Sequence, residues 1–198
     1  MFLEDKFLAF AHRGGNEFAP ENSFKAFESA VNVGYKYLET DVHLTKDGFL
    51  IAFHDDSLDR VTNKSGLIRD LTLNEIKKAK IGGSEEIPLL SELLISFPNC
   101  FFNIDCKVDE TVLPLINLLK NSEFLNRVCI GSFSQKRINF IRNSLGNDIK
   151  TSMGPAEVIL SKFLSFTSIG YNFKSSYTWF QYSSFTLGLI FKLLIYLF

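Results

Sequence analysis

The chain has 198 residues, of which 46% are hydrophobic and 22% are charged, a composition that suits one globular domain with a sizeable core. Its 21 Lys and Arg against 22 Asp and Glu leave a net charge of −1, so the chain lacks the basic field that would make nucleic acid its main partner.

The chain begins MFLEDKF, with Glu4 and Asp5 where a secretory signal would carry positive charge. We therefore expect no export signal and a cytoplasmic protein. Cys100, Cys106 and Cys129 lie in apolar or strand-like settings without the close spacing of a zinc site, so we expect buried, reduced thiols, which agrees with that compartment.

The first half of the chain predicts strands, one helix and a polar insertion. In order, the segments are a strand at 7–12, a helix at 22–32, strands at 37–45 and 49–54 joined into a hairpin by a KDG turn, and a polar, turn-rich segment at 55–87. Asn22 is the predicted N-cap of the helix, and Thr72 and Glu75 have the spacing of a capping box within the insertion.

The second half predicts helices and strands in alternation. Helices are expected at 89–96, 111–120, 134–145 and 155–164, and strands at 100–107, 127–133, 149–154 and 166–173. Such alternation requires parallel strands joined by helical crossovers, which makes an α/β fold. The whole chain then has six such strands plus the hairpin strand, whereas a closed βα barrel needs eight.

Two of the predicted strands carry polar side chains on one face, because side chains alternate with a period of two. These are Glu39, Asp41 and His43 in YLETDVH, and Asn103, Asp105 and Lys107 in FNIDCK. Crowded carboxylates repel one another unless a cation lies between them, and hard oxygen ligands suit Mg²⁺, Ca²⁺ or Mn²⁺. Taken alone, an acidic pair in a strand is more often a solvated face.

His12 and His54 each end an apolar strand. Two histidines near a carboxylate-bound metal suit a proton donor and a proton acceptor on either side of a phosphate. A single histidine at the end of a strand is more often a structural hydrogen-bonding group, so the interpretation depends on the order of all these signals along the chain.

That order resembles the glycerophosphodiester phosphodiesterase family. The matching stretches are AHRGG, APENSFKAF, YLETDVHLTKDGFLIAFHDDSLDRVTNKSG, IPLLSELL and FNIDCK, and the resemblance runs from Phe7 to at least Phe173. It implies a TIM-barrel-like parallel βα fold with a small insertion after the second strand, matching 55–87. It also implies metal-dependent hydrolysis of glycerophosphodiesters to glycerol 3-phosphate and an alcohol.

The resemblance also implies roles for individual residues. It makes His12 and His54 the catalytic general acid and base, Glu39, Asp41 and Asp105 the ligands of Mg²⁺ or Ca²⁺, and Arg13 and Lys107 the groups that hold the substrate phosphate. The family more often has glutamate in place of Asp105, so this carboxylate reaches about one methylene less far.

The end of the chain departs from the family pattern. We expect a barrel domain at 1–173 that is incomplete, with about six of eight strands, followed by an apolar, aromatic-rich tail at 174–198, in which Trp179 does not match the family's tryptophan motif. The tail suits a helix that covers the open barrel, a truncated or out-of-frame product, or an interfacial membrane anchor. The corresponding functions are an active phosphodiesterase, an inactive or weakly active fragment of one, and a membrane-associated module.

Overall fold

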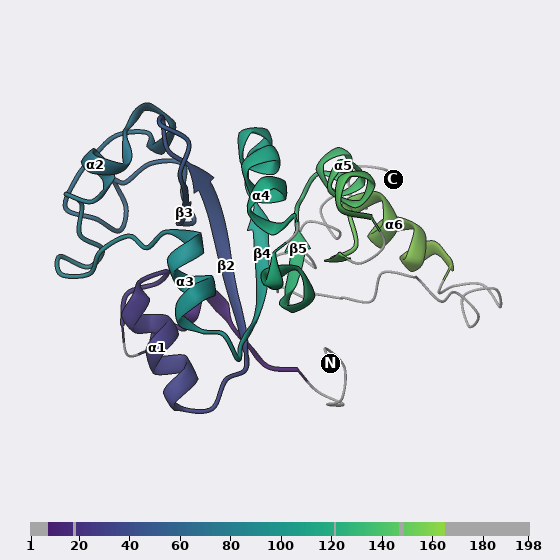
Figure 1. Ribbon diagram of the computed structural model, residues 1–198, viewed down its shortest axis with the longest axis horizontal. Helices are drawn as coiled ribbons and strands as arrows, with labels where there is room; N and C mark the ends of the chain where they lie inside the picture. The colour runs from purple at the N-terminus through teal and green to yellow at the C-terminus, as the bar shows by residue number, and fades with distance from the viewer. Residues whose placement is uncertain (1–7, 18, 121, 147–148, 165–198) are drawn as a thin grey trace, which may run out of the picture.

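The computed structural model of the protein describes residues 8–17, 19–120, 122–146 and 149–164, and a sheet with the strand order β1-β2-β4-β5-β6 runs through its centre (Figure 1). All four of these strand pairs are parallel. The strands are β1 Phe10–Ala11, β2 Tyr37–Leu44, β4 Phe101–Cys106, β5 Val128–Gly131 and β6 Lys150–Thr151. The predicted strand at 166–173 and the tail at 174–198 lie outside the described residues.

The predicted hairpin is confirmed. Strand β3, Leu50–Ala52, pairs antiparallel with β2, and Val42 lies opposite Ala52. Strand β2 also pairs with β1 and β4, so it has three strand partners among the described residues.

Helices connect the parallel strands, as the alternating pattern predicts. They are α1 Phe24–Asn32, α2 Leu73–Ile76, α3 Leu90–Ser96, α4 Val112–Leu119, α5 Gln135–Leu145 and α6 Pro155–Leu164, with short 3₁₀ helices at His12–Gly14, Ile68–Asp70, Asp109–Thr111 and Glu123–Arg127. In Figure 1, α1 lies at the lower left and α6 at the right, with the labelled strands between them. Within the described residues, no helix is long and apolar enough to cross a membrane.

The main core lies between the sheet and its helices. The strands contribute the side chains of one face, and the helices contribute their apolar stripes; buried members include Leu38, Phe102 and Ile130 from the strands and Phe27, Leu93, Leu115 and Ile141 from the helices. Each fully buried side chain of this size stabilises the fold by about 1.5–3 kcal/mol. Cys100, Cys106 and Cys129 are all buried and free, as the sequence predicts.

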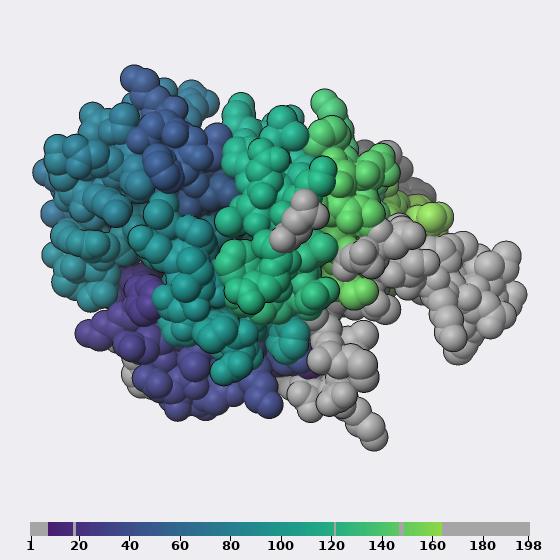
Figure 2. Space-filling model, in the orientation of Figure 1, coloured from purple at the N-terminus to yellow at the C-terminus, as the bar shows by residue number. Residues whose placement is uncertain are grey.

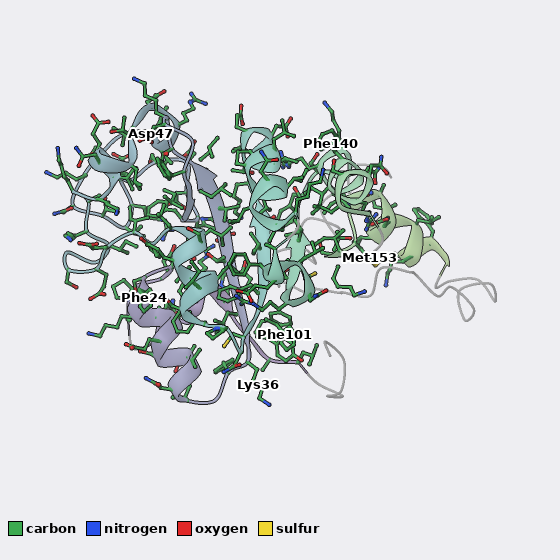
Figure 3. All side chains as sticks on the ribbon, in the orientation of Figure 1. Phe24, Lys36, Asp47, Phe101, Phe140 and Met153 are labelled. Carbon is green, nitrogen blue, oxygen red and sulfur yellow. The ribbon has the colours of Figure 1, made fainter. Side chains whose placement is uncertain are left out.

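The opposite face of the sheet is apolar at the amino ends of the strands. Tyr37 stacks on Phe101 with ring centroids 5.3 Å apart and packs against Phe10 at the same distance, and Cys129 is buried beside them. Figure 3 labels Phe101 at this end of the sheet and Asp47, in the hairpin turn, at the other. Polar side chains on this face are therefore displaced toward the carboxyl ends of the strands.

The N-cap of α1 is Ser23, and the prediction of Asn22 was wrong. The Ser23 hydroxyl accepts a hydrogen bond from Ala26 N–H at 3.2 Å, and its backbone is extended, as an N-cap requires. Asn22 instead adopts a left-handed conformation, with φ 56°, and accepts a hydrogen bond from the Thr40 hydroxyl at 2.9 Å. Its side chain joins the loop before α1 to β2.

Strands β1 and β3 are among the strands that are shorter than predicted, and in both cases the histidine expected at the strand's end lies outside the strand. Strand β1 ends at Ala11, so His12 begins a 3₁₀ turn. Strand β3 ends at Ala52, although Phe53 N–H still donates to the carbonyl of Asp41 at 3.0 Å. His12 therefore follows β1 directly, and His54 follows β3 after one intervening residue, Phe53.

The insertion at 55–87 forms a lobe, visible as the blue to teal mass at the left of Figure 2, and it packs with Ile51 and Phe53 around a second, smaller core. Its buried members are Ile51, Phe53, Leu58, Ile68, Ile76, Ala79, Ile81 and Ile87. The predicted capping box is confirmed, because Glu75 Oε2 accepts from Thr72 N–H at 2.8 Å. Asp47 Oδ1 accepts from Leu73 N–H at 2.9 Å and thereby ties α2 to the hairpin turn.

Gly14 allows the loop after β1 to touch α1, which leads to a stability prediction. Its φ is +77°, and a Cβ placed on it would lie 2.9 Å from the backbone nitrogen of Phe27. We expect Gly14→Ala to lower the free energy of unfolding by about 1–3 kcal/mol in chemical denaturation. Gly15→Ala is the matched control, because Gly15 has φ +80° with nothing within 4 Å. If the two variants lose the same free energy of unfolding, the close approach of residue 14 to α1 adds no cost to the backbone strain.

Candidate active site

Strands β2 and β4 bring three carboxylates together at the carboxyl end of the sheet. Their parallel register places Asp41 opposite Asp105 and Glu39 opposite Asn103. Glu39, Asp41 and Asp105 are only 3%, 2% and 8% exposed. Buried carboxylates are costly unless they are paired or hydrogen-bonded, so their partners define what this cluster can do.

Lys107 is the cation between the two aspartates. Its Nζ lies 2.8 Å from Asp41 Oδ1 and 3.0 Å from Asp105 Oδ2. Burial opposes the charged ammonium, but the adjacent Asp105 and Asp41 carboxylates outweigh it and raise the pKa of Lys107. Burial raises the pKa of Asp105, and Lys107 counters that shift only in part. The ammonium therefore stays charged and offsets part of the repulsion between the carboxylates of Asp41 and Asp105.

Glu39 is the most crowded of the three acids. Its Oε2 accepts a hydrogen bond from Arg13 N–H at 2.9 Å and lies 3.8 Å from His12 Nε2. Burial and the neighbouring Asp41 raise the pKa of Glu39 to about 8. Burial therefore favours the uncharged form of Glu39.

Arg13 reaches into the same cluster from the loop after β1. Its backbone is left-handed, with φ 52° and ψ 37°, a conformation that residues other than glycine adopt uncommonly and at some energetic cost. The guanidinium Nε lies 3.5 Å from Asp41 Oδ2, and Nη1 donates to Glu21 Oε1 at 3.0 Å. The strained turn thus aims a fixed positive charge at the carboxylates.

The two histidines are the more accessible members of the site. The side chain of His12 is 65% exposed and that of His54 is 32% exposed. Partial desolvation and the positive charge on Arg13 lower the pKa of His12, and His54 is near enough to add to this shift. At neutral pH the imidazole of His12 is therefore mainly neutral.

His54 is held by two contacts that the sequence analysis missed. Its Nδ1 lies 2.6 Å from Asp55 Oδ1, and its carbonyl accepts a hydrogen bond from His43 Nε2 at 3.0 Å. An ionised carboxylate can only accept, so the proton of neutral His54 is assigned to Nδ1 and Nε2 is left with its lone pair. This tautomer presents Nε2 for proton transfer.

The donor set fits an oxygen-preferring divalent cation in part. Asp41 Oδ2 and Asp105 Oδ1 are buried and receive no hydrogen bond from the described part of the chain. At Gly131 a Cβ would fill space 3.7 Å from Asp105 Oδ1, so glycine leaves this inner position open. Among the described residues, however, no group of three or more His, Cys, Asp or Glu side chains is arranged to hold a metal ion. Lys107 is the cation that the two aspartates share here, and ligation by all three acids stays a prediction.

The structure thus brings the predicted residues to one end of the sheet, but by two routes. Direct contacts join six of them: His12, Arg13, Glu39, Asp41, Asp105 and Lys107. His54 joins them through a chain of ion pairs that includes Glu21, Asp55 and Arg60. Asp55 could have been suspected because it follows His54 directly, whereas nothing local distinguishes Arg60 from other loop residues.

The fold and the site define an α/β protein of the barrel type, with acidic, basic and histidine side chains gathered where its parallel strands end. The chain belongs to the Glycerophosphoryl diester phosphodiesterase family, whose model matches residues 12–181. This confirms the family resemblance that the sequence analysis found.

Two relatives and one solved structure illustrate the membership. The chain is 35% identical over 153 residues to the probable glycerophosphodiester phosphodiesterase 2 of Mycobacterium tuberculosis, a match that covers 77% of this chain and 58% of that protein. It is 38% identical over 151 residues to a glycerophosphodiester phosphodiesterase of Caldanaerobacter subterraneus, over 69% of this chain and 62% of the relative. The chain therefore spans about six tenths of the length of these relatives.

The solved structure is that of an Oleispira antarctica phosphodiesterase in complex with the product sn-glycerol-3-phosphate. It is 27% identical with a TM-score of 0.68, and the match covers 80% of this chain and 72% of that one. Together with the parallel strand order, this likeness confirms the TIM-barrel-like α/β fold class.

Proposed function

We propose that the protein hydrolyses glycerophosphodiesters to glycerol 3-phosphate and an alcohol, with His12 and His54 as the proton-transfer groups. The observation that carries this proposal is the arrangement of the two accessible imidazoles beside Arg13, Lys107 and the buried carboxylates at the end of the sheet. The product bound by the Oleispira antarctica relative supports the substrate class.

Each group has a task that follows from the charge of the reaction. A phosphodiester is an anion that gains negative charge in the transition state, so the fixed guanidinium of Arg13 and the ammonium of Lys107 stabilise the transition state more than the bound substrate. One imidazole in its neutral form takes the proton of the attacking oxygen, and the other in its protonated form donates a proton to the leaving alcohol. The attacking oxygen comes either from water or from the substrate's own glycerol hydroxyl, through a cyclic phosphate.

We further propose Mg²⁺ or Ca²⁺ as the cofactor, held by Glu39, Asp41 and Asp105, while Mn²⁺ shares the same preference for oxygen ligands. The bound cation would polarise a phosphoryl oxygen and add positive charge to the site. The raised pKa of Glu39, caused by burial and by Asp41, supports this because a cation bound between the carboxylates would favour the charged form that burial disfavours. The three buried, free cysteines support a cytoplasmic location.

The test is release of glycerol 3-phosphate from glycerophosphocholine by the purified chain. We expect turnover with Mg²⁺ or Ca²⁺ and loss of it in a chelator, restored when the cation is added back. A metal-dependent signal that survives in the variant with both His12 and His54 replaced by alanine would trace to a contaminant. No turnover with any of the three cations would contradict the proposal for this chain and favour the inactive-fragment hypothesis.

A further inference from the structure

Arg60, in the insertion, binds two carboxylates that belong to different parts of the chain. Its Nε and Nη2 donate to Asp55 Oδ2 and Oδ1 at 2.5 and 3.1 Å. Its Nη1 and Nη2 donate to Glu21 Oε2 and Oε1 at 3.2 and 2.5 Å. Both pairs are two-pronged, so the planar guanidinium fixes the orientation of each carboxylate as well as its distance.

Each of these carboxylates holds a residue of the proposed site. Asp55 accepts the Nδ1 proton of His54 at 2.6 Å, and Glu21 accepts from the guanidinium of Arg13 at 3.0 Å. The resulting chain of contacts runs from the catalytic imidazole through Arg60 to the phosphate-binding arginine. It joins the start of the insertion to the loop before α1, across 39 positions of sequence.

We propose that Arg60 is a positioning residue. Through Asp55 and Glu21 it fixes the positions of the His54 and Arg13 side chains relative to each other. The inference rests on the proposed hydrolytic function, because it assigns Arg60 an effect on the two groups that act on the phosphodiester. It goes beyond the site residues found from the sequence, since Arg60 itself touches neither imidazole nor any of the three buried acids among its described contacts.

The exposure of these groups separates positioning from simple stabilisation. The side chain of Arg60 is 48% exposed, and exposed ion pairs contribute little to the stability of a fold. A small displacement of a catalytic group, in contrast, can reduce a rate by about 10²-fold. Hydrogen bonding to Arg60 also lowers the pKa of Asp55 to about 2, which shows that Arg60 favours the ionised carboxylate that accepts from His54.

The kinetic test compares Arg60→Ala with the full-length wild-type chain. We expect kcat/KM for glycerophosphocholine to fall by about 10²-fold while the melting temperature changes by only a few degrees. Arg60→Lys keeps the charge but cannot bind both carboxylates in two-pronged fashion, so we expect it to remain close to Arg60→Ala. Added guanidinium at millimolar concentration should restore part of the activity of Arg60→Ala only. The control is Arg69→Ala, an exposed arginine of the same insertion.

Two further variants test the Asp55–His54 contact and the Glu21–Arg13 contact separately. Asp55→Asn replaces the carboxylate by an amide, which can donate as well as accept and so no longer fixes the His54 proton on Nδ1; we expect it to lower kcat with little change in KM. Glu21→Gln loosens Arg13 and should mainly raise KM. If Arg60→Ala keeps more than half of the wild-type kcat/KM, or if Arg69→Ala loses as much activity, the inference is overturned.

A readout without turnover keeps the inference testable if the proposed function fails. The chain has three histidines, so ¹⁵N spectra of histidine-labelled protein at mildly alkaline pH can be assigned with a His54→Gln variant. In the wild type we expect the Nδ1-protonated tautomer of His54, and in Arg60→Ala a mixture of the two tautomers. With an inactive wild type, an unchanged tautomer in Arg60→Ala overturns the inference, whereas the lack of turnover alone contradicts only the proposed function.

Discussion

Replacing His54 or His12 by alanine will lower kcat by about 10²–10⁴-fold while the fold and the binding of substrate stay largely intact. General acids and bases each contribute a factor of this size, because without them the proton must come from or go to water. Both side chains are accessible, so their removal leaves no cavity in the core. The structure gives His54 a defined tautomer through Asp55 at 2.6 Å, which is the arrangement that a proton-transfer group needs.

The measurement is steady-state release of glycerol 3-phosphate, with circular dichroism and melting temperature as controls for folding. Imidazole added to the buffer should recover part of the activity of either alanine variant, since a small base can enter the vacated space. A variant that retains more than about half of the wild-type kcat removes that histidine from the catalytic set.

Glu39→Gln will separate activity from stability. We expect this variant to lose activity by about 10²-fold or more and to bind Mg²⁺ or Ca²⁺ more weakly, because glutamine supplies no negative charge to the cation. In a chelator, however, we expect it to melt at a higher temperature than the wild type. Glutamine keeps an oxygen for Arg13 N–H and removes the charge that burial and Asp41 already disfavour, as the pKa of about 8 for Glu39 shows.

Glu28→Gln is the matched control for this experiment, since Glu28 lies exposed on α1 and is not among the charges that shift the pKa of Glu39. It should change neither turnover nor the melting temperature by a measurable amount. Wild-type turnover in Glu39→Gln would exclude Glu39 as a metal ligand. A lower melting temperature in the chelator would show that the ionised Glu39 stabilises the fold through Arg13 and His12.

Local patterns in the sequence predicted the order of strands and helices and the acids of the site. The alternation of side chains along a strand is a property of the strand alone, so the sequence placed Glu39 and Asp41 on one face of their strand and Asp105 on one face with Asn103 and Lys107. The prediction of Asn22 as N-cap failed because Thr40 on a distant strand binds its side chain, which is not visible in the local sequence. The family resemblance, in turn, rested on the order of motifs along the chain.

Only the tertiary structure decided which charges meet. The register of β2 and β4 sets Lys107 between Asp41 and Asp105, and nothing within either strand specifies that register. Arg60 meets Glu21 across 39 residues because the insertion packs with Ile51 and Phe53 around the second core and so reaches the loop before α1. Side-chain periodicity is determined over a few residues, whereas ion pairs between distant segments depend on the packing of the whole sheet and the insertion. The sequence by itself therefore determined the candidate residues, and the fold determined which partners they meet.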